Sequence, residues 1–482
     1  MEPRGIRAPT RRLLAGAVAA LLLAGCTGSP GPDGDQPAPP SSGPATTGMA
    51  AGIRRHLDAL QAAADGNGGT RAAGTGGYDA SVRYVAEQLR QAGYRPEIQR
   101  FDATTARNRT APLLELPGAA ATPRADRDFR PFAFSGNGEA AAASRPVDLA
   151  PGAAASTSGC EPSDFAGFPR GGIAVLQRGT CPFRAKAQNA QQAGAAAAVI
   201  FDPGRPGVLA GTLGGPGITI PVLAVTPAVA RQLTGANARR PARVRVDVES
   251  RGHPTGNVIA ELPGSGDRVV MVGAHLDSVP AGAGMNDNAS GSATVLELAR
   301  QLAATRPTAT VRFAWWGSEE LGLLGSRHYL EQLGRADRDR IALYLNLDMV
   351  GSRNAQRLVY DGGARGAPPG SQVIQQVLTD HLRGQGLAVG TTSLGGGSDH
   401  APFAAAGIPV GGLYTGAGEV KSRQEAERFG GTAGRPADPC YHRRCDDLDN
   451  LDLTVLGQMA GAAAHAVATF ARDPALVDRA RG

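Results

Sequence analysis

Two strand-like apolar runs, each followed closely by ionisable residues, constrain the fold of this chain more than any other feature. The first run ends at His275, and the second, Thr310–Trp316, is followed by Glu319 and Glu320. Between them a Gly- and Asn-rich loop containing Asp287 leads into a helical pattern. Because the ends of parallel strands share one edge of an open α/β sheet, we expect these imidazole and carboxylate groups to meet there. A metal site requires oxygen and nitrogen donors of this kind.

The same alternation continues through the second half of the chain. Helices are predicted over residues 371–384 and 453–471, and strands over residues 341–349 and 408–414. Strands separated by helices of about 10–15 residues form a largely parallel sheet that helices cover on both faces. We therefore predict an α/β fold built on a mostly parallel mixed sheet flanked by helices.

The segment before residue 109 contributes to the same sheet. Residues 78–92 carry an apolar stripe at helical spacing, and residues 95–101 alternate like a strand. This segment has too little apolar surface to fold alone. The predicted division is a main domain formed by residues 49–108 and 251–474, an inserted domain formed by residues 109–250, and a tail formed by residues 475–482.

Two more residues could join the cluster at the strand ends. Asp348 closes the apolar strand 341–349, and a carboxylate in such a place needs a charged partner. His442 lies between Cys440 and Cys445. A single histidine is more often a hydrogen-bonded structural residue than a ligand, so it is the whole set that indicates a metal site.

The first 25 residues indicate export from the cytoplasm. Arg11 and Arg12 precede an apolar run, Leu13–Ala24, of 12 residues. As a helix this run would reach about 18 Å, too short for a hydrocarbon core of about 30 Å. Residues 1–25 are therefore predicted to be a secretory signal. The run is followed by Gly-Cys and resembles a bacterial lipobox with Cys26 as the lipidated N-terminus; an ordinary cleaved signal is the alternative, and the arginine pair also suits twin-arginine export.

Residues 26–48 are rich in Gly, Pro, Ser and Thr and contain no large apolar residue. Such a composition cannot bury enough surface to order itself, so we expect a tether between a lipid anchor and the fold. The protein is then extracytoplasmic, either anchored to the outer face of the bacterial cell membrane or secreted.

The cysteines agree with an oxidising compartment. Apart from Cys26 there are four, Cys160, Cys181, Cys440 and Cys445, which allow three disulfide connectivities. The pairs that are local in sequence, 160–181 and 440–445, are favoured. The spacing of the second pair is poor for a zinc finger, so we expect disulfides.

Charge argues against a nucleic-acid partner. The formal net charge is +6, but four arginines and one glutamate lie in the predicted signal. About +3 remains, and no basic face interleaved with aromatic residues stands out. We expect no nucleic-acid partner and a monomeric protein.

Residues 109–250 differ in character from the rest and contain no histidine. The segments 160–165 and 177–183, with Lys186 and Asn189, closely resemble a protease-associated (PA) domain. The resemblance implies a β-rich α/β module with a binding, lid or spacer role. A purely structural role is the alternative.

The cluster at the strand ends resembles the zinc aminopeptidases of the M28 type, in particular secreted Streptomyces-like members. The motifs that carry the resemblance are Ala274-His275-Leu276-Asp277-Ser278, Met285-Asn286-Asp287-Asn288, Ser318-Glu319-Glu320, Asn346-Leu347-Asp348-Met349, Gly397-Ser398-Asp399-His400 and Cys440-Tyr441-His442. The resemblance covers residues 49–108 and 251–474. It implies a zinc exopeptidase-like fold and an enzyme that releases N-terminal residues, with a preference for large apolar ones, from peptides.

The resemblance also implies a site for two Zn²⁺ ions per chain. Asp287 would bridge the ions, His275 and Asp348 would complete one ligand set, and Glu320 and His442 would complete the other. Each ion then has three protein ligands and an open position for water, as catalytic zinc sites do.

Three further residues are expected to assist catalysis or to support the metal site. Glu319 would be the general base that takes a proton from water and returns it to the leaving amine. Tyr441 would donate a hydrogen bond to the oxyanion, as in the family. From the sequence spacing, we expect the Asp277 carboxylate to lie on the strand face of His275 and to accept its second ring N–H.

Two positions need separate treatment. Gly397 stands where close relatives carry an arginine, so substrate recognition here must differ or use another group. His400 could rival His442 as a ligand, but the family match gives it a supporting role.

Alternative functions stay open from the sequence. Within the family these are carboxypeptidase or aminoacyl cyclase chemistry at a similar site. From another class comes a non-catalytic, surface-tethered protein that binds peptides through the PA-like module.

Overall fold

A computed structural model gives the structure of residues 44–119, 121–150, 156–203, 207–209, 211–235, 238–395 and 397–480. The predicted signal, Cys26 and most of the predicted tether lie outside the described residues. The first helix, α1 (Pro44–Asp65), begins inside the predicted tether instead of near Met49. A proline is compatible with this start, because the first turn of a helix does not use its backbone N–H groups.

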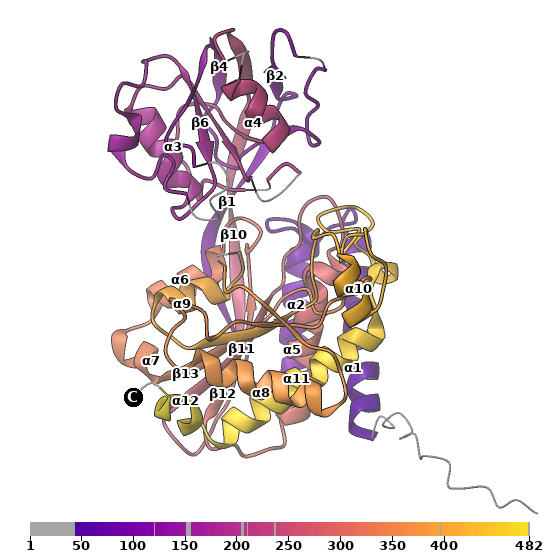
Figure 1. Ribbon diagram of the computed structural model, residues 1–482. Helices are drawn as coiled ribbons and strands as arrows, with labels where there is room; N and C mark the ends of the chain where they lie inside the picture. The colour runs from indigo at the N-terminus through magenta and orange to yellow at the C-terminus, as the bar shows by residue number, and fades with distance from the viewer. Residues whose placement is uncertain are drawn as a thin grey trace, which may run out of the picture. The chain divides into compact units, whose positions relative to one another are not determined.

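One mixed sheet carries all the strands predicted to end at the metal cluster (Figure 1). Its eight strands lie in the order β1 (Glu97–Asn108), β10 (Val248–Leu262), β12 (Thr310–Trp316), β11 (Val269–His275), β13 (Ile341–Leu347), β16 (Val410–Tyr414), β14 (Leu358–Tyr360) and β15 (Gly390–Thr392). The central strands β12, β11, β13 and β16 are parallel. The pairs β1–β10, β10–β12 and β14–β16 are antiparallel. The predicted fold class, a mostly parallel mixed sheet, is confirmed.

Helices cover both faces of this sheet, because successive strand residues alternate between two cores. Val270 and Val272 of β11 join one core with α1, α2 (Gly76–Gln91), α5 (Ser290–Leu302), α8 (Ser371–Gly384) and α11 (Leu453–Arg472). Val269 and Met271 join the other core with α6 (Leu324–Gln332) and α9 (His400–Ala405). The remaining short helical segments of this part are η2 (Met285–Ala289), α7 (Arg335–Arg340), α10 (Arg423–Phe429), η3 (Leu448–Asn450) and α12 (Ala475–Arg479).

Two smaller sheets form from residues 113–246 and have cores of their own. The antiparallel sheet consists of β2 (Leu113–Glu115), β9 (Ala242–Val246) and β4 (Gly138–Ala142). The mainly parallel sheet consists of β3 (Phe129–Pro131), β8 (Val222–Val225), β7 (Ala197–Phe201), β6 (Ile173–Gln177) and β5 (Ser144–Pro146). Their helices are η1 (Pro162–Phe165), α3 (Phe183–Gln192) and α4 (Pro227–Thr234). We propose that residues 109–250 are an inserted domain, since β1 leads into these sheets and β10 leads out of them.

Helix α11 is the one helix of the described residues that is long and apolar enough to cross a membrane by length and composition, with a mean hydropathy of 1.3. Half of that stretch is buried in the protein. Leu456, Met459 and Phe470 are among its residues in the core of the main sheet. It is therefore built as a core helix.

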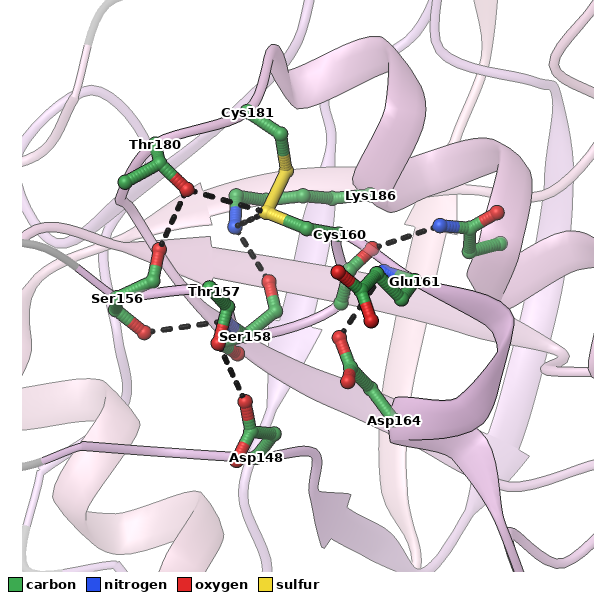
Figure 2. Close-up of a disulfide and its surroundings, with 12 residues drawn as sticks. Asp148, Ser156, Thr157, Ser158, Cys160, Glu161, Asp164, Thr180, Cys181 and Lys186 are labelled. Carbon is green, nitrogen blue, oxygen red and sulfur yellow. Dashed lines mark hydrogen bonds between the residues drawn. A yellow bond between two sulfur atoms is a disulfide. The ribbon is translucent and has the colours of Figure 1, made fainter.

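Both sequence-local disulfide pairs are present, Cys160–Cys181 and Cys440–Cys445. The first joins the segment before η1 to the segment before α3. Figure 2 shows it beside Lys186, a lysine of α3 that is fully buried. The second closes a loop of the main domain around Tyr441 and His442.

Candidate metal centre

The two central strands bring two candidate ligands together at the carboxyl edge of the main sheet. His275 is the last residue of β11, and Asp348 directly follows β13. Gly273 pairs with Asn346 in the parallel register of these strands, so two residues later His275 lies beside Asp348. Asp287 comes from η2 (Met285–Ala289), the irregular turn that leads into α5, and its own backbone is not helical.

Asp287 lies between two imidazoles and offers one carboxylate oxygen to each. Its Oδ1 lies 3.2 Å from Nε2 of His275, and its Oδ2 lies 3.0 Å from Nε2 of His442. His275 Nε2 is also 3.3 Å from Oδ1 of Asp348, and His442 Nε2 is 3.2 Å from Oε2 of Glu320. The five predicted ligands therefore form two sets that share Asp287. Ligand atoms about 2.0–2.1 Å from a tetrahedral Zn²⁺ lie about 3.3 Å apart, so these separations fit the ion.

Unpartnered oxygen atoms support the same fit. Oε1 of Glu320 and Oδ1 of Asp348 are buried and have no hydrogen-bond partner. A buried carboxylate oxygen without a donor is costly in a protein interior. A cation bound between these groups would remove that cost.

The electrostatics of the site point to an excess of negative charge. Burial raises the pKa of Glu319 well above its usual value, and repulsion from Glu320, Asp399 and Asp348 adds to the effect. Burial lowers the pKa of His275, but Glu319 and Asp348 outweigh burial and leave this pKa well above its usual value. Such a cluster calls for added positive charge, which divalent ions supply.

The Asp287 carboxylate is the group held most firmly in its charged form. Burial by itself raises its pKa, but hydrogen bonds and charge interactions with His275 and His442 reverse this and lower the pKa below the usual range. A permanently charged carboxylate is suited to sit between two cations.

Glu319 lies inside the cluster, with a carboxylate oxygen within 4.8 Å of the ligand atoms that His275 and Asp348 offer. It is 9% exposed. Its backbone N–H donates to Oδ1 of Asp277 at 3.0 Å, and the N–H of Glu320 donates to Oδ2 at 3.3 Å. Asp277 thus fixes the turn that carries both glutamates.

Asp277 lies beside His275, but its backbone is closer to the imidazole than its carboxylate is. Nδ1 of His275 donates to the backbone carbonyl of Asp277 at 3.1 Å, whereas the carboxylate is 3.7 Å away. The carboxylate thus lies on the Nδ1 side of His275 but beyond hydrogen-bond distance, and its two oxygens accept the N–H groups of Glu319 and Glu320. The residue supports the site, but mainly through the glutamate turn.

Tyr441 and His442 lie in the loop closed by the second disulfide. Their rings stack, with centroids 3.9 Å apart. His442 adopts a left-handed backbone conformation, φ 57°, which is uncommon for a residue other than glycine. Burial raises the pKa of Tyr441, and the nearby charges of Asp287 and Glu320 raise it further, so its hydroxyl stays protonated and can donate.

Ser398 belongs to the site, although its role was not predicted. Its Oγ donates to Oδ2 of Asp348 at 2.6 Å and accepts from Nδ2 of Asn346 at 2.8 Å. This leaves Oδ1 of Asp348 free to face the metal position. The motif Gly397-Ser398-Asp399-His400 was the available signal, but nothing local in the sequence says which of its side chains reaches Asp348.

His400 and Gly397 lie outside the ligand cluster. Nε2 of His400 lies 3.0 and 2.9 Å from the carbonyls of Leu394 and Gly395, and its ring is tilted against Tyr360 with centroids 4.6 Å apart. This placement fits a supporting role. A side chain added at Gly397 would meet no other atom within 4 Å at its Cβ.

A cavity of about 620 Å³ lies on the same edge of the main sheet. Tyr414, at the carboxyl end of β16, pairs with Leu358, and both line the cavity with residues of α10. Because β16 is parallel to β13, the cavity beside Tyr414 and the carboxylate of Asp348 lie at the same carboxyl edge of the sheet. Its walls include apolar Phe429 and charged Glu419 and Arg428.

Comparison with known proteins agrees with this geometry. A profile of peptidase family M28 matches residues 257–467, and a PA domain profile matches residues 147–233. An "Aminopeptidase" of Pseudomonas aeruginosa is 41% identical over 451 residues, which are 89% of this chain and 82% of that protein. The Mycobacterium tuberculosis protein named "Probable lipoprotein aminopeptidase LpqL" is 39% identical over 498 residues, 97% of each chain.

A solved structure, "Aminopeptidase from Aneurinibacillus sp. strain AM-1", superposes with a TM-score of 0.67 at 27% identity. The match covers 89% of this chain and 94% of that one. Relatives of this identity and coverage share family and fold, and the resemblance inferred from the sequence motifs is confirmed. The chain belongs to peptidase family M28 and carries a PA domain.

Proposed function

We propose that this chain is an aminopeptidase of family M28 that works with two Zn²⁺ ions. Asp287 would be shared by the two ions, His275 and Asp348 would complete one ligand set, and Glu320 and His442 would complete the other. The observation that carries the proposal is the position of Asp287, whose two oxygens face two different imidazoles at 3.2 and 3.0 Å.

When bound, the ions would lower the pKa of a water molecule and polarise the carbonyl of the bond to be cleaved. Glu319 takes the proton of that water and returns it to the leaving amine. Its burial among other carboxylates, which raises its pKa, suits it to hold the proton between the two steps. Tyr441 donates from its hydroxyl to the oxyanion.

The substrate is a peptide with a free N-terminus. We propose that the cavity beside Tyr414 receives the side chain of the N-terminal residue. Leu358, Tyr414 and Phe429 give part of its wall an apolar surface, and Glu419, Glu425 and Arg428 make the rest charged. The apolar part suits the large apolar residues that the family resemblance implies.

We propose that the protein acts outside the cytoplasm. We propose that residues 1–25 are removed and that Cys26 carries the lipid, so that the fold is tethered to the outer face of the cell membrane. The name of the Mycobacterium tuberculosis relative, a lipoprotein aminopeptidase, supports this location. For the PA domain we propose the binding, lid or spacer role that the family resemblance implies.

Hydrolysis assays with three substrates test the proposal. Leucine p-nitroanilide presents a free amine, its N-acetyl derivative presents none, and an N-blocked peptide with a free C-terminus reports carboxypeptidase activity. We expect turnover of the first alone, its loss with a chelator, and its recovery with Zn²⁺. Turnover of the N-blocked peptide would establish the carboxypeptidase alternative. A separate assay with a peptide that begins with glutamine tests the cyclase alternative, which its cyclisation would establish. No chelator-sensitive turnover of any substrate would favour a binding protein.

A further inference from the structure

We infer that two buried carboxylates, Asp438 and Asp446, are positioning residues for the metal centre. They clamp Asn286 and thereby hold the segment of Asp287 against the segment of His442. The inference rests on the ligand sets of the proposed function and goes beyond them, because neither acid faces a metal position.

Asp446 binds the backbone of the bridging segment directly. Its Oδ1 accepts the backbone N–H of Asn286 at 2.8 Å, and its Oδ2 accepts the N–H of Asp287 at 3.1 Å. Its own carbonyl accepts the N–H of Met285 at 3.2 Å. Three successive backbone groups before and at the bridging carboxylate are therefore held by one residue, which is 2% exposed.

Asp438 binds the side chain of the same asparagine. Its Oδ2 accepts from Nδ2 of Asn286 at 2.6 Å, and its Oδ1 accepts the backbone N–H of Cys440 at 2.8 Å. Asn450 links the two acids, since its Nδ2 lies 2.9 Å from Oδ1 of each. All four oxygens of the two buried carboxylates accept from named donors.

The two acids flank the disulfide ring that carries Tyr441 and His442. Asp438 lies two residues before Cys440, and Asp446 directly follows Cys445. Both ends of the ring are thus fixed to Asn286, the residue before Asp287. A shift of the ring would move His442 and the bridging segment together.

Asn286 also reaches the third ligand segment. Its Oδ1 accepts the backbone N–H of Gly351 at 3.1 Å, and its Nδ2 donates to Oγ of Ser352 at 3.0 Å. These residues belong to the turn that follows Asp348. The asparagine, 0% exposed, is therefore the shared partner of the segments that carry Asp287, His442 and Asp348, and we expect it to set their spacing before any ion binds.

To test the clamp, the Zn²⁺ affinity of the Asp446→Asn variant is compared with that of wild type. Both are measured by calorimetric titration of the metal-free full-length protein. The amide can accept at one oxygen only, and its NH₂ group faces a backbone N–H. We expect the Zn²⁺ affinity of the weaker of the two binding sites to fall by about 10–100-fold, the range found when groups that orient metal ligands are lost. We expect kcat to fall by a similar factor while KM changes little, since the substrate cavity is untouched.

Asp449→Asn is the matched control. This aspartate lies on the same short turn but is exposed, and its substitution should leave both binding steps unchanged. If Asp446→Asn binds Zn²⁺ as wild type does, or if both variants lose affinity equally, the clamp is wrong. If wild type itself binds no Zn²⁺, the proposed ligand sets fail, which is a different result.

Hydrogen exchange of the wild-type protein tests the clamp even if Asp446→Asn does not fold. In the metal-free protein the amides of Asn286, Asp287 and Cys440 should exchange slowly, because their acceptors are in place without metal. The clamp is refuted if these amides exchange as fast as those of exposed loops until Zn²⁺ is added.

Discussion

Two buried clusters of charge in this molecule are built differently, one at the metal centre and one beside the disulfide of the PA domain. In the PA domain Lys186 is 0% exposed. Its Nζ donates to the carbonyl of Ser158 and lies 3.5 Å from Sγ of Cys160 (Figure 2). At the metal centre, by contrast, one buried oxygen each of Glu320 and Asp348 accepts no hydrogen bond, although an imidazole lies 3.2–3.3 Å from each carboxylate.

The difference separates structure from function. A buried polar group whose hydrogen bonds are made within the protein fits a structural role. A buried oxygen that has no donor is tolerated where a bound ligand will contact it. The comparison predicts that substitutions at the metal centre act on turnover and those beside Cys160 act on stability.

The largest effect is expected for Asp287→Ala, which removes the residue that the two proposed ligand sets share. We expect loss of measurable turnover together with loss of bound Zn²⁺, measured by assay and by elemental analysis of the dialysed protein. Full turnover in this variant would contradict the shared role.

Glu319→Gln should separate metal binding from proton transfer. The amide keeps the shape of the side chain but cannot take a proton, so kcat should fall by about 10²–10⁴-fold. Zn²⁺ content should stay at the wild-type level, because Glu319 is not in either ligand set. A parallel loss of Zn²⁺ would show instead that Glu319 is a ligand.

The strand pattern indicated part of the site, and the resemblance of the motifs to one family implied the full ligand set and the role of Glu319. His275 and Asp348 are polar residues that end apolar strands, and periodicity places those strands in one sheet. The clamp carries no such signal: Asn286 lies 152 residues from Asp438 and 160 from Asp446, so only the folded chain brings them together.

Two other features were missed for the same reason. The strand predicted over residues 95–101 continues in β1 to Asn108, because its partner β10 offers matched groups such as Glu249 opposite Arg107, with nitrogen and oxygen 3.0 Å apart. The contact of Asp277 with the glutamate turn also depends on a neighbouring strand. The alternation of apolar and polar residues within one segment predicts a strand, but it does not indicate which distant segment that strand pairs with.

The two disulfides should differ in what their removal changes. The Cys160–Cys181 pair closes a loop of about 22 residues, for which loop entropy gives about 3.4 kcal/mol. We expect Cys160→Ser with Cys181→Ser to lower the free energy of unfolding by about this amount, measured by urea titration, with kcat unchanged. A loss of kcat in the folded double variant would connect the PA domain to catalysis.

Removal of the Cys440–Cys445 pair should cost less stability and more activity. Its loop of about 6 residues gives about 2 kcal/mol. Because the ring carries Tyr441 and His442, Cys440→Ser with Cys445→Ser should lower kcat, by up to about 10-fold if the clamp at Asp438 and Asp446 still holds both ends. Equal kcat in the variant and in wild type would show that Tyr441 and His442 are held in place without the Cys440–Cys445 disulfide.

The smallest effect is expected for Lys186→Met. At pH 7 we expect a loss of about 1 kcal/mol, because the carbonyl of Ser158 loses its donor while a buried charge is also removed. Burial lowers the pKa of Lys186 from 10.5 to about 8. Between these two pH values the unfolded chain therefore holds a proton at this lysine that the folded chain has released.

That difference fixes the sign of the pH dependence. Stability rises with pH wherever the unfolded state binds more protons, so wild type should gain stability relative to Lys186→Met from about pH 8 to 10.5. Below about pH 8 the difference between the two proteins should be constant. Urea titrations of both proteins at pH 7, 8, 9 and 10 would measure the difference in free energy of unfolding. The other titratable groups contribute equally in both proteins, so their contributions cancel in this difference. A difference independent of pH would mean that Lys186 keeps its ordinary pKa, and that the carbonyl and sulfur around it replace water fully.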